Sequence, residues 1–352
     1  MKVLIVGGGL SGICLAHQLL QEGHTVRLTD EGRNYSSIIA AGMINPMVFR
    51  KMVKTWRGDD LIPYLISFYK SIEQKVGAKF FFPRKIRRVF ATEVERKLWV
   101  ERSNDNQYND YITTIEETED QPEYVKGAFG SGWVKSPGYV DARIFMEANH
   151  SYLKNQNILV FDAFDHDKLD VESASYKGES YDKIVFAEGY KGKENPLFNY
   201  LPLQQTKGEV LTIRSEKLSR AEILNRKCFV LPTEDGFLRL GATFKWDTND
   251  PTPTNDAKEQ LIEQYNTLSK APFKIIEQEG GIRPTVTDRR PLIGVHPEYS
   301  KCYIFNGMGT KGYMIAPYFS KHFTDYLTDK VTLDSEVDIQ RFYKKHYTPP
   351  NF

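Results

Sequence analysis

The chain has 352 residues, of which 40% are apolar, so it can bury one large core or two smaller ones without disulfides or metals to hold the fold together. Its 47 lysines and arginines against 46 aspartates and glutamates leave a net charge of +1, which excludes a net field that would draw the whole molecule to nucleic acid or an anionic membrane. The three cysteines, Cys14, Cys228 and Cys302, have no CxxC spacing and suit neither a disulfide framework nor a zinc site, so we expect a cytoplasmic protein.

The first predicted element is a strand over residues 2–6, whose apolar and β-branched residues are typical of a strand buried on both faces. It runs into a turn in which Gly7, Gly9 and Gly12 occupy the first, third and sixth positions, and a helix with apolar residues at helical spacing follows and stops at Gly23. A secretion signal is the alternative interpretation, but the glycines interrupt the apolar run and no small-residue cleavage site follows.

Each glycine of this turn has a separate use in binding a dinucleotide. Gly7 allows the tight turn, Gly9 lets the backbone approach a pyrophosphate, and Gly12 lets the helix lie close to the strand. The first helical residues, Leu10 and Ser11, are candidates as well, because the start of a helix offers N–H groups and the positive end of the dipole to phosphates.

A second predicted strand, residues 26–29, ends at Asp30, which lies 18 residues after Gly12. An acid in that place can accept hydrogen bonds from both hydroxyls of an unphosphorylated adenosine ribose, and we count Glu31 in the same site. Strand, glycines, helix, second strand and acid together strongly predict a dinucleotide site. This unit alone does not decide between FAD and NAD.

Small residues also gather in three later segments, where backbone would pass close to a flat ligand. These are residues 36–46, the end of a predicted strand over residues 181–189, and a glycine turn, residues 307–312, between a predicted strand over 303–305 and a final helix over 313–327. Candidate cofactor-binding residues here, together with Phe164, are Ser37, Ala41, Gly42, Ala187, Glu188, Gly189, Gly307, Gly309, Thr310, Lys311 and Gly312.

Further short motifs follow in a fixed order: Gly138-Tyr139-Val140-Asp141, Pro202-Leu203, Lys207-Gly208-Glu209-Val210, Gly241-Ala242-Thr243, Arg283-Pro284 and the closing glycine turn. Their order and spacing resemble the D-amino-acid oxidase (DAO) superfamily of FAD-dependent oxidoreductases, especially glycine oxidase and the oxidase domain of the tRNA-modifying 5-methylaminomethyluridine enzyme. The resemblance covers nearly the whole chain and implies that the cofactor is FAD. Some members attach FAD through a cysteine in the final flavin-binding block, but residues 282–294 contain none, so we expect non-covalent FAD.

The resemblance implies hydride transfer from a substrate carbon to the flavin, and it points to two catalytic candidates. Arg283 stands where glycine oxidase-like relatives bind the substrate carboxylate, and Pro284 favours an extended backbone that would aim it; a structural ion pair is the alternative. Lys311 could add positive charge near the pyrimidine end of the flavin ring, where negative charge develops; a solvated loop lysine is the alternative.

The predicted fold is α/β, with a Rossmann-like FAD-binding domain of the GR2/DAO type and an interleaved, mostly antiparallel α+β substrate domain. We expect the first domain to comprise residues 1–45, 140–200 and 281–352, and the second to comprise residues 46–139 and 201–280. The seven histidines lack HxxH and HExxH spacing, so we expect no metal site, and no apolar stretch reaches the length of a membrane span.

The first functional hypothesis is oxidation of a C–N bond in a small amino acid or secondary amine. The second is a stand-alone oxidase of carboxymethylaminomethyl-uridine in tRNA, because residues 307–317 resemble the tRNA-modifying enzyme more closely, although that family usually has arginine where Lys311 stands. Two basic clusters, within residues 50–57 and 84–88, could bind RNA or could be solvated faces. A third hypothesis is a dehydrogenase that passes electrons to a quinone or partner protein instead of oxygen.

Overall fold

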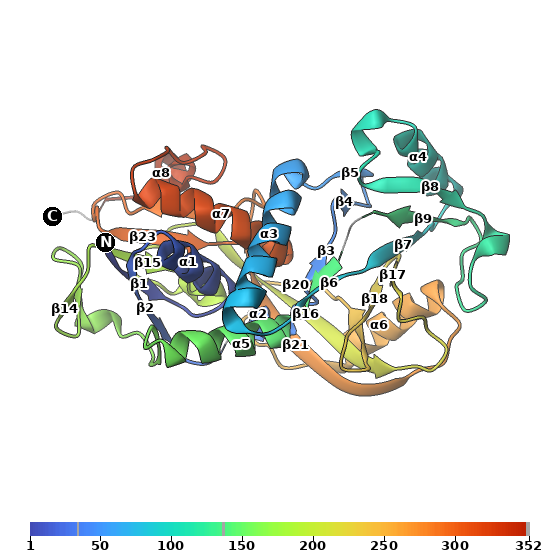
Figure 1. Cartoon of the computed structure of the whole chain (residues 1–352), viewed down its shortest axis with the longest axis horizontal. Helices are drawn as coiled ribbons and strands as arrows, with labels where there is room; N and C mark the ends of the chain where they lie inside the picture. The colour runs from blue at the N-terminus through green and yellow to red at the C-terminus, as the bar shows by residue number, and fades with distance from the viewer. Residues whose placement is uncertain (34, 136–137, 350–352) are drawn as a thin grey trace.

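The structure is a computed structural model that describes residues 1–33, 35–135 and 138–349. Two lobes are visible in Figure 1, one on the left around β1, β15 and β23 and one on the right around β7 to β9 and β17 to β18. The N-terminus lies in the left lobe, and helix α7 near the end of the chain returns to the same lobe (Figure 1). The chain therefore crosses between the lobes more than once.

The left lobe is built on a six-stranded sheet in the order β11-β2-β1-β15-β23-β22. All neighbouring strands are parallel except β22 and β23. The strands are β1 (Lys2–Val6), β2 (Thr25–Asp30), β11 (Leu159–Phe161), β15 (Lys183–Phe186), β22 (Leu292–Val295) and β23 (Cys302–Asn306). The carboxyl ends of β1, β2 and β15 meet at one edge, which is where open parallel sheets bind ligands.

Strand β1 is buried on both faces, as its composition predicts. Val3 and Ile5 belong to a core cluster with helices α1 and α7, whereas Leu4 and Val6 belong to a second cluster on the opposite face. The helices of this lobe are α1 (Leu10–Gln21), α2 (Tyr35–Ile39), α3 (Gly58–Val76), α5 (Ala142–Asn155), α7 (Gly312–Leu327) and α8 (Tyr343–His346). Helix α7 packs against both α1 and α3, so the predicted final helix is confirmed as part of the core.

The right lobe is built on a nine-stranded sheet in which β21 pairs with β16 outside the main order β20-β16-β19-β18-β17-β7-β9-β8. Its pairs are antiparallel except β7 with β17, which confirms a mostly antiparallel sheet. The strands are β7 (Lys85–Val89), β8 (Ile112–Glu116), β9 (Ser131–Val134), β16 (Leu203–Arg214), β17 (Glu222–Asn225), β18 (Phe229–Pro232), β19 (Leu238–Gly241), β20 (Lys245–Trp246) and β21 (Lys274–Val286). Helices α4 (Glu93–Ser103) and α6 (Asn255–Leu268) accompany this sheet.

The long pair β16 and β21 reaches from the right lobe to the left one (Figure 1). Both strands contact the 3₁₀ turn η4 (Gly189–Lys193), which follows β15, and β21 also contacts α2. Strand β21 runs through residue 280, where we predicted a domain boundary, and residues on both sides of that position pair with β16. The division of the chain into two domains stays a prediction.

The remaining elements are short. They are β3 (Met43–Ile44), β4 (Met47–Val48), β5 (Val53–Lys54), β6 (Phe81–Pro83), β10 (Gly138–Val140), β12 (Leu169–Asp170), β13 (Ser175–Tyr176), β14 (Glu179–Ser180) and the 3₁₀ turns η1 (Asn106–Tyr108), η2 (Thr118–Asp120), η3 (His166–Lys168), η5 (Gly309–Lys311) and η6 (Ile339–Phe342). Within the part of the chain that the structure describes, no helix has the length and apolar character needed to cross a membrane.

The packing at Gly12 yields a first prediction. A Cβ added there would lie 1.9 Å from the carbonyl oxygen of Gly7, so Gly12→Ala must push α1 away from β1. We expect the variant to lose about 1–3 kcal/mol of unfolding free energy, measured by urea denaturation. Gly58→Ala is the matched control, because at the first position of α3 the nearest atoms to an added Cβ are 3.9 Å away. Equal stability of the two variants would contradict this account of the helix–strand contact.

Candidate active site

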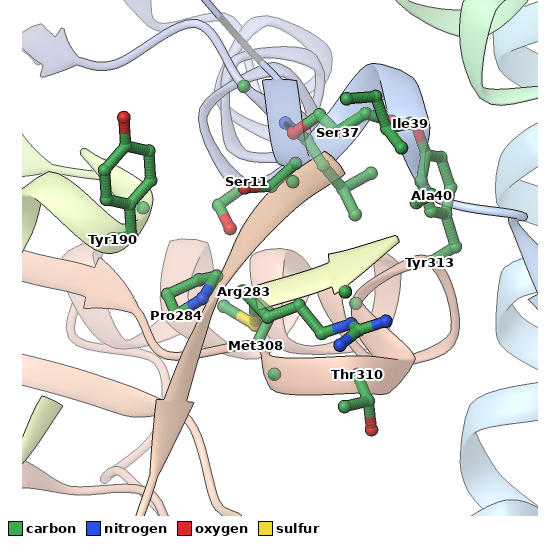
Figure 2. Close-up of a pocket in the computed structure, with 18 of the residues that line it drawn as sticks. Ser11, Ser37, Ile39, Ala40, Tyr190, Arg283, Pro284, Met308, Thr310 and Tyr313 are labelled. Carbon is green, nitrogen blue, oxygen red and sulfur yellow. Dashed lines mark hydrogen bonds between the residues drawn. The ribbon is translucent and has the colours of Figure 1, made fainter. Parts of the chain in front are cut away.

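A cavity of about 670 Å³, within the usual range for small-molecule sites, lies between the two sheets. Figure 2 shows Ser11 of α1, Ser37 of α2, Tyr190 of η4 and Arg283 of β21 around it. The carboxyl ends of β1, β2 and β15 form one side, and β16, β21 and the turns beside β17 to β20 form the other. The cavity is therefore built from segments far apart in the sequence.

Most of the predicted site residues line this one cavity. They are Gly7, Gly9, Leu10, Ser11, Asp30, Glu31, Ser37, Ala41, Gly42, Phe164, Ala187, Glu188, Gly189, Arg283, Gly309, Thr310, Lys311 and Gly312. Two do not line it, because Gly12 packs against the Gly7 carbonyl and Gly307 lies against Val286 and Leu292. These two glycines shape the neighbouring turns.

Asp30 holds the glycine turn in place. Its Oδ2 accepts a hydrogen bond from Gly8 N–H and its Oδ1 accepts one from Gly32 N–H, both at 2.6 Å. A carboxylate has acceptor capacity for more than these two bonds, so a ribose contact is compatible with this geometry. Glu31 beside it forms an ion pair with Lys191 of η4.

Arg283 lies in the cavity wall with neutral groups around it. Its Nη1 donates to the carbonyl oxygen of Thr243 at 3.2 Å, and its guanidinium carbon lies 4.5 Å from the centre of the Phe244 ring. The guanidinium covers Gly208, where an added Cβ would lie 1.9 Å from Nη2. Burial lowers the pKa of Arg283 to about 10. No carboxylate of the described residues pairs with it, so the structural ion pair that we considered is absent there.

Lys311 is anchored, not solvated. Its Nζ donates to the carbonyl oxygen of Asn45 at 3.0 Å and that of Met47 at 3.4 Å, and also to the hydroxyl of Thr55. Burial lowers the pKa of Lys311 to about 8. All three partners are neutral oxygens, so the protonated lysine adds uncompensated positive charge at the start of α7, where the helix dipole is also positive.

Residues 2–326 match the family model described as FAD dependent oxidoreductase (DAO). The chain belongs to this family of FAD-dependent oxidoreductases. It is 25% identical to the glycine oxidase of Bacillus subtilis over 94% of this chain and 93% of that one. It is 22% identical to the tRNA 5-methylaminomethyl-2-thiouridine biosynthesis bifunctional protein MnmC of Marinobacter nauticus, over 98% of this chain but only 59% of that protein. The crystal structure of glycine oxidase from Geobacillus kaustophilus has the same fold, with a TM-score of 0.79, 18% identity and coverage of 94% of this chain and 96% of that one.

FAD is the cofactor of this family, and the cavity fits it. One continuous space runs from Asp30 past the start of α1 to Arg283 on β21. Gly9, the N-cap residue of α1, brings no side chain, so backbone N–H groups of the first turn are open to a diphosphate. Leu10 is an exception, because its N–H already donates to Ser37 Oγ at 3.0 Å. The predicted α/β fold, the family and FAD are thus confirmed.

Several residues lining the FAD-dependent oxidoreductase's cavity had not been predicted. They include Asn225 at the end of β17, Lys227 in the turn that follows, Phe229 at the start of β18, and Phe244 from the connection between β19 and β20. These are turns of the nine-stranded sheet, and their sequences contain no motif for a ligand. Only the pairing of β16 with β19 and β21 brings them to the flavin cavity.

The two basic clusters are largely neutralised by neighbouring acids, which favours the alternative without RNA. Arg87 and Arg88 are buried, whereas Arg50, Lys51 and Lys85 are exposed and have no ion pair with a described residue. The ion pairs are Lys54 with Asp59, Arg57 with Asp334, Arg84 with Glu234, Arg87 with Glu116 and Glu222, and Arg88 with Glu95.

The anchored lysine yields a prediction about the flavin. Because burial lowers the pKa of Lys311 to about 8, its ammonium is charged below that pH and neutral above it. We expect Lys311→Met to lower the midpoint potential of the bound flavin at pH 7 by roughly 30 mV, since positive charge favours the reduced, more negative ring; for two electrons this equals about 1.4 kcal/mol. Redox titrations at pH 7 and pH 9 measure it.

The matched control is Lys311→Arg, which keeps a positive charge at both pH values. We expect the flavin potential of the Arg variant at pH 7 to stay near that of the wild type. Between pH 7 and pH 9 the wild-type potential should fall further because Lys311 loses its proton, and this additional fall should be smaller in both variants. The same potential and pH response in the Met variant and the wild type would remove Lys311 from the electrostatics of the flavin.

Proposed function

We propose that this FAD-dependent oxidoreductase oxidises the C–N bond of a small amino acid or secondary amine that carries a carboxylate. The observation that carries the proposal is the Arg283 guanidinium, a cation in the cavity wall whose partners are the Thr243 carbonyl and the Phe244 ring. A buried cation without a counter-ion is costly, and a planar guanidinium can bind both oxygens of a carboxylate. A substrate carboxylate would supply the missing charge.

The residues at the two ends of the cavity suggest how FAD is held. We assign the diphosphate to the first turn of α1 around Gly9 and Ser11, the ribose to Asp30, and the ring to Ala41, Gly42 and the start of α7. When bound, FAD accepts a hydride from the carbon next to the amine nitrogen. We propose that it is bound non-covalently, because Cys228, the one cysteine among the described residues that line the cavity, is buried and burial raises its thiol pKa to about 12, which disfavours a nucleophilic thiolate.

The charges near Arg283 also favour the reactive form of the amine. Hydride transfer needs a neutral amine, and nearby positive charge lowers the pKa of an ammonium group. Arg283 and Lys311 line this part of the cavity, and none of the described lining residues from β16 to β21 or from residues 308–313 is an acid. Arg283 would thus hold the carboxylate, and both cations would help deprotonate the neighbouring nitrogen.

A second candidate function is oxidation of a modified uridine in tRNA, which the similarity to MnmC over 98% of this chain favours. The group oxidised there in this hypothesis is a carboxymethyl amine, so the same site would serve. The mostly paired basic clusters offer little for RNA, so this function ranks second.

The electron acceptor is either oxygen or a quinone or partner protein. Release of peroxide under air would identify oxygen as the acceptor. The three buried free cysteines support our placing the enzyme in the cytoplasm.

Arg283→Ala tests the proposed function. We expect kcat/KM for a carboxylate-bearing amine to fall at least about thirtyfold, mostly through KM, since removing one partner of a buried charge pair costs about 2–5 kcal/mol. Steady-state turnover of glycine, sarcosine and D-amino acids is measured with an added electron acceptor, and reduction of the flavin alone is followed by anaerobic loss of its visible band. Arg214→Ala, at the exposed end of β16, is the matched control and should leave kcat/KM unchanged. An unchanged KM in the Arg283 variant would remove this residue from the substrate site.

A further inference from the structure

The acidic residues of the cavity lie at one of its two ends, where Arg33 and Lys191 also line it. The acids that line it, Asp30, Glu31, Glu188 and Glu194, all lie at the end of β2 or in the segment that follows β15. The half formed by β16 to β21 and by the start of α7 is lined, among the described residues, by three cations and no acid. Those cations are Arg283, Lys311 and Lys227.

Two of the three cations have neutral partners and a use in the proposed reaction. Arg283 donates to a backbone carbonyl, and Lys311 donates to two carbonyls and a hydroxyl. One substrate carboxylate and the developing charge of the flavin account for these two. The third cation, Lys227, is left without a role.

Lys227 stands at the tip of the turn between β17 and β18. The turn is closed by pairing of Asn225 with Phe229 and by a hydrogen bond from Arg226 N–H to the Cys228 carbonyl at 2.8 Å. Asn225 and Phe229 line the cavity beside the lysine. Lys227 is exposed at this rim, and no ion pair or hydrogen bond links it to any of the residues that the structure describes.

Hydrogen bonds from neighbouring segments fix the turn that carries Lys227. The Arg226 guanidinium donates to the carbonyl oxygens of Lys126 at 3.0 Å and Ala91 at 3.3 Å. The Asn225 side-chain oxygen accepts a hydrogen bond from Arg88 at 2.7 Å. A lysine on a fixed turn is thus presented to the cavity while its ammonium group stays without a partner in the described chain.

FAD itself does not account for this cation. Its anionic part is the diphosphate, which the first turn of α1 suits, and that turn belongs to the six-stranded sheet at the other side of the cavity. Lys227 belongs to the nine-stranded sheet, on the same side as Arg283. An anion at Lys227 would therefore come from the substrate.

We propose that Lys227 binds a second carboxylate of the substrate, so that the preferred substrate class is a secondary amine or amino acid with two carboxylates, one at Arg283 and one at the rim. The inference rests on the proposed function. One ammonium group beside one amide suits a singly charged carboxylate better than a phosphate, which usually draws several donors. The second carboxylate adds specificity, and the hydride still leaves from the carbon next to the nitrogen.

The test compares two secondary amines that differ only in the second carboxylate, sarcosine and iminodiacetate. For the holoenzyme we measure the second-order rate constant of anaerobic flavin reduction by each amine in the wild type, Lys227→Ala and Lys227→Glu. We expect the iminodiacetate-to-sarcosine ratio to fall about fivefold in the Ala variant, the upper range for an exposed ion pair, and further in the Glu variant, where the charges repel. The values for sarcosine should not change.

Two controls complete the experiment: a change of ionic strength and a substitution of an exposed lysine outside the cavity. Raising the ionic strength should lower the ratio in the wild type and leave it unchanged in Lys227→Ala, because an exposed pair is screened. Lys97→Ala, on the exposed face of α4, should behave as the wild type. An equal ratio in the wild type and both Lys227 variants would overturn the inference and leave the proposed function standing, whereas flavin reduction by neither amine in any variant would overturn both.

Discussion

The antiparallel pairing of β16 with β21 holds the side of the cavity formed by the nine-stranded sheet against the side formed by the six-stranded sheet. In its register Thr206 faces Arg283 and Gly208 faces Gly281, so the guanidinium lies over a glycine where a larger residue would displace it. Close to Arg283 the same pair contacts η4 and α2, which belong to the other side of the cavity: Ser36 donates to the carbonyl of Ile282, and Gln205 donates to that of Tyr190. Because one pair of strands fixes both the position of Arg283 and the approach of the two sheets, the geometry of the active site follows from main-chain pairing more than from any flexible loop.

The second organising feature is the separation of charge along the cavity. All the acids of the described lining gather where an adenosine ribose would lie, together with Arg33 and Lys191, whereas the half where a carboxylate and the flavin ring would lie carries only cations. The partly buried cations Arg283 and Lys311 weaken the empty protein, since their partners are neutral oxygens and an aromatic ring. Binding of the proposed anionic substrate would remove this penalty, and the same positive field would favour a neutral amine. Affinity and reactivity would thus arise from one arrangement of charges.

The sequence allowed correct prediction of those parts that local pattern determines. The strand, glycine turn and helix at the N-terminus, the final helix and the α/β class follow from hydrophobic periodicity and turn chemistry. The acids that neutralise the basic clusters could not be found in this way, since Glu222 pairs with Arg87 from a distant segment. The partners of Lys311, and the presence of Lys227 and Phe244 at the cavity, likewise depend on contacts between elements far apart in the chain.

The central claim is that the flavin is reduced by an amine whose carboxylate is bound at Arg283. Anaerobic flavin reduction of the wild-type holoenzyme by sarcosine and by dimethylamine tests it most directly, because the two amines differ only by the carboxylate. The account predicts loss of the visible flavin band with sarcosine and a far slower loss, or none, with dimethylamine. Reduction by both at the same rate, or by neither, would contradict it.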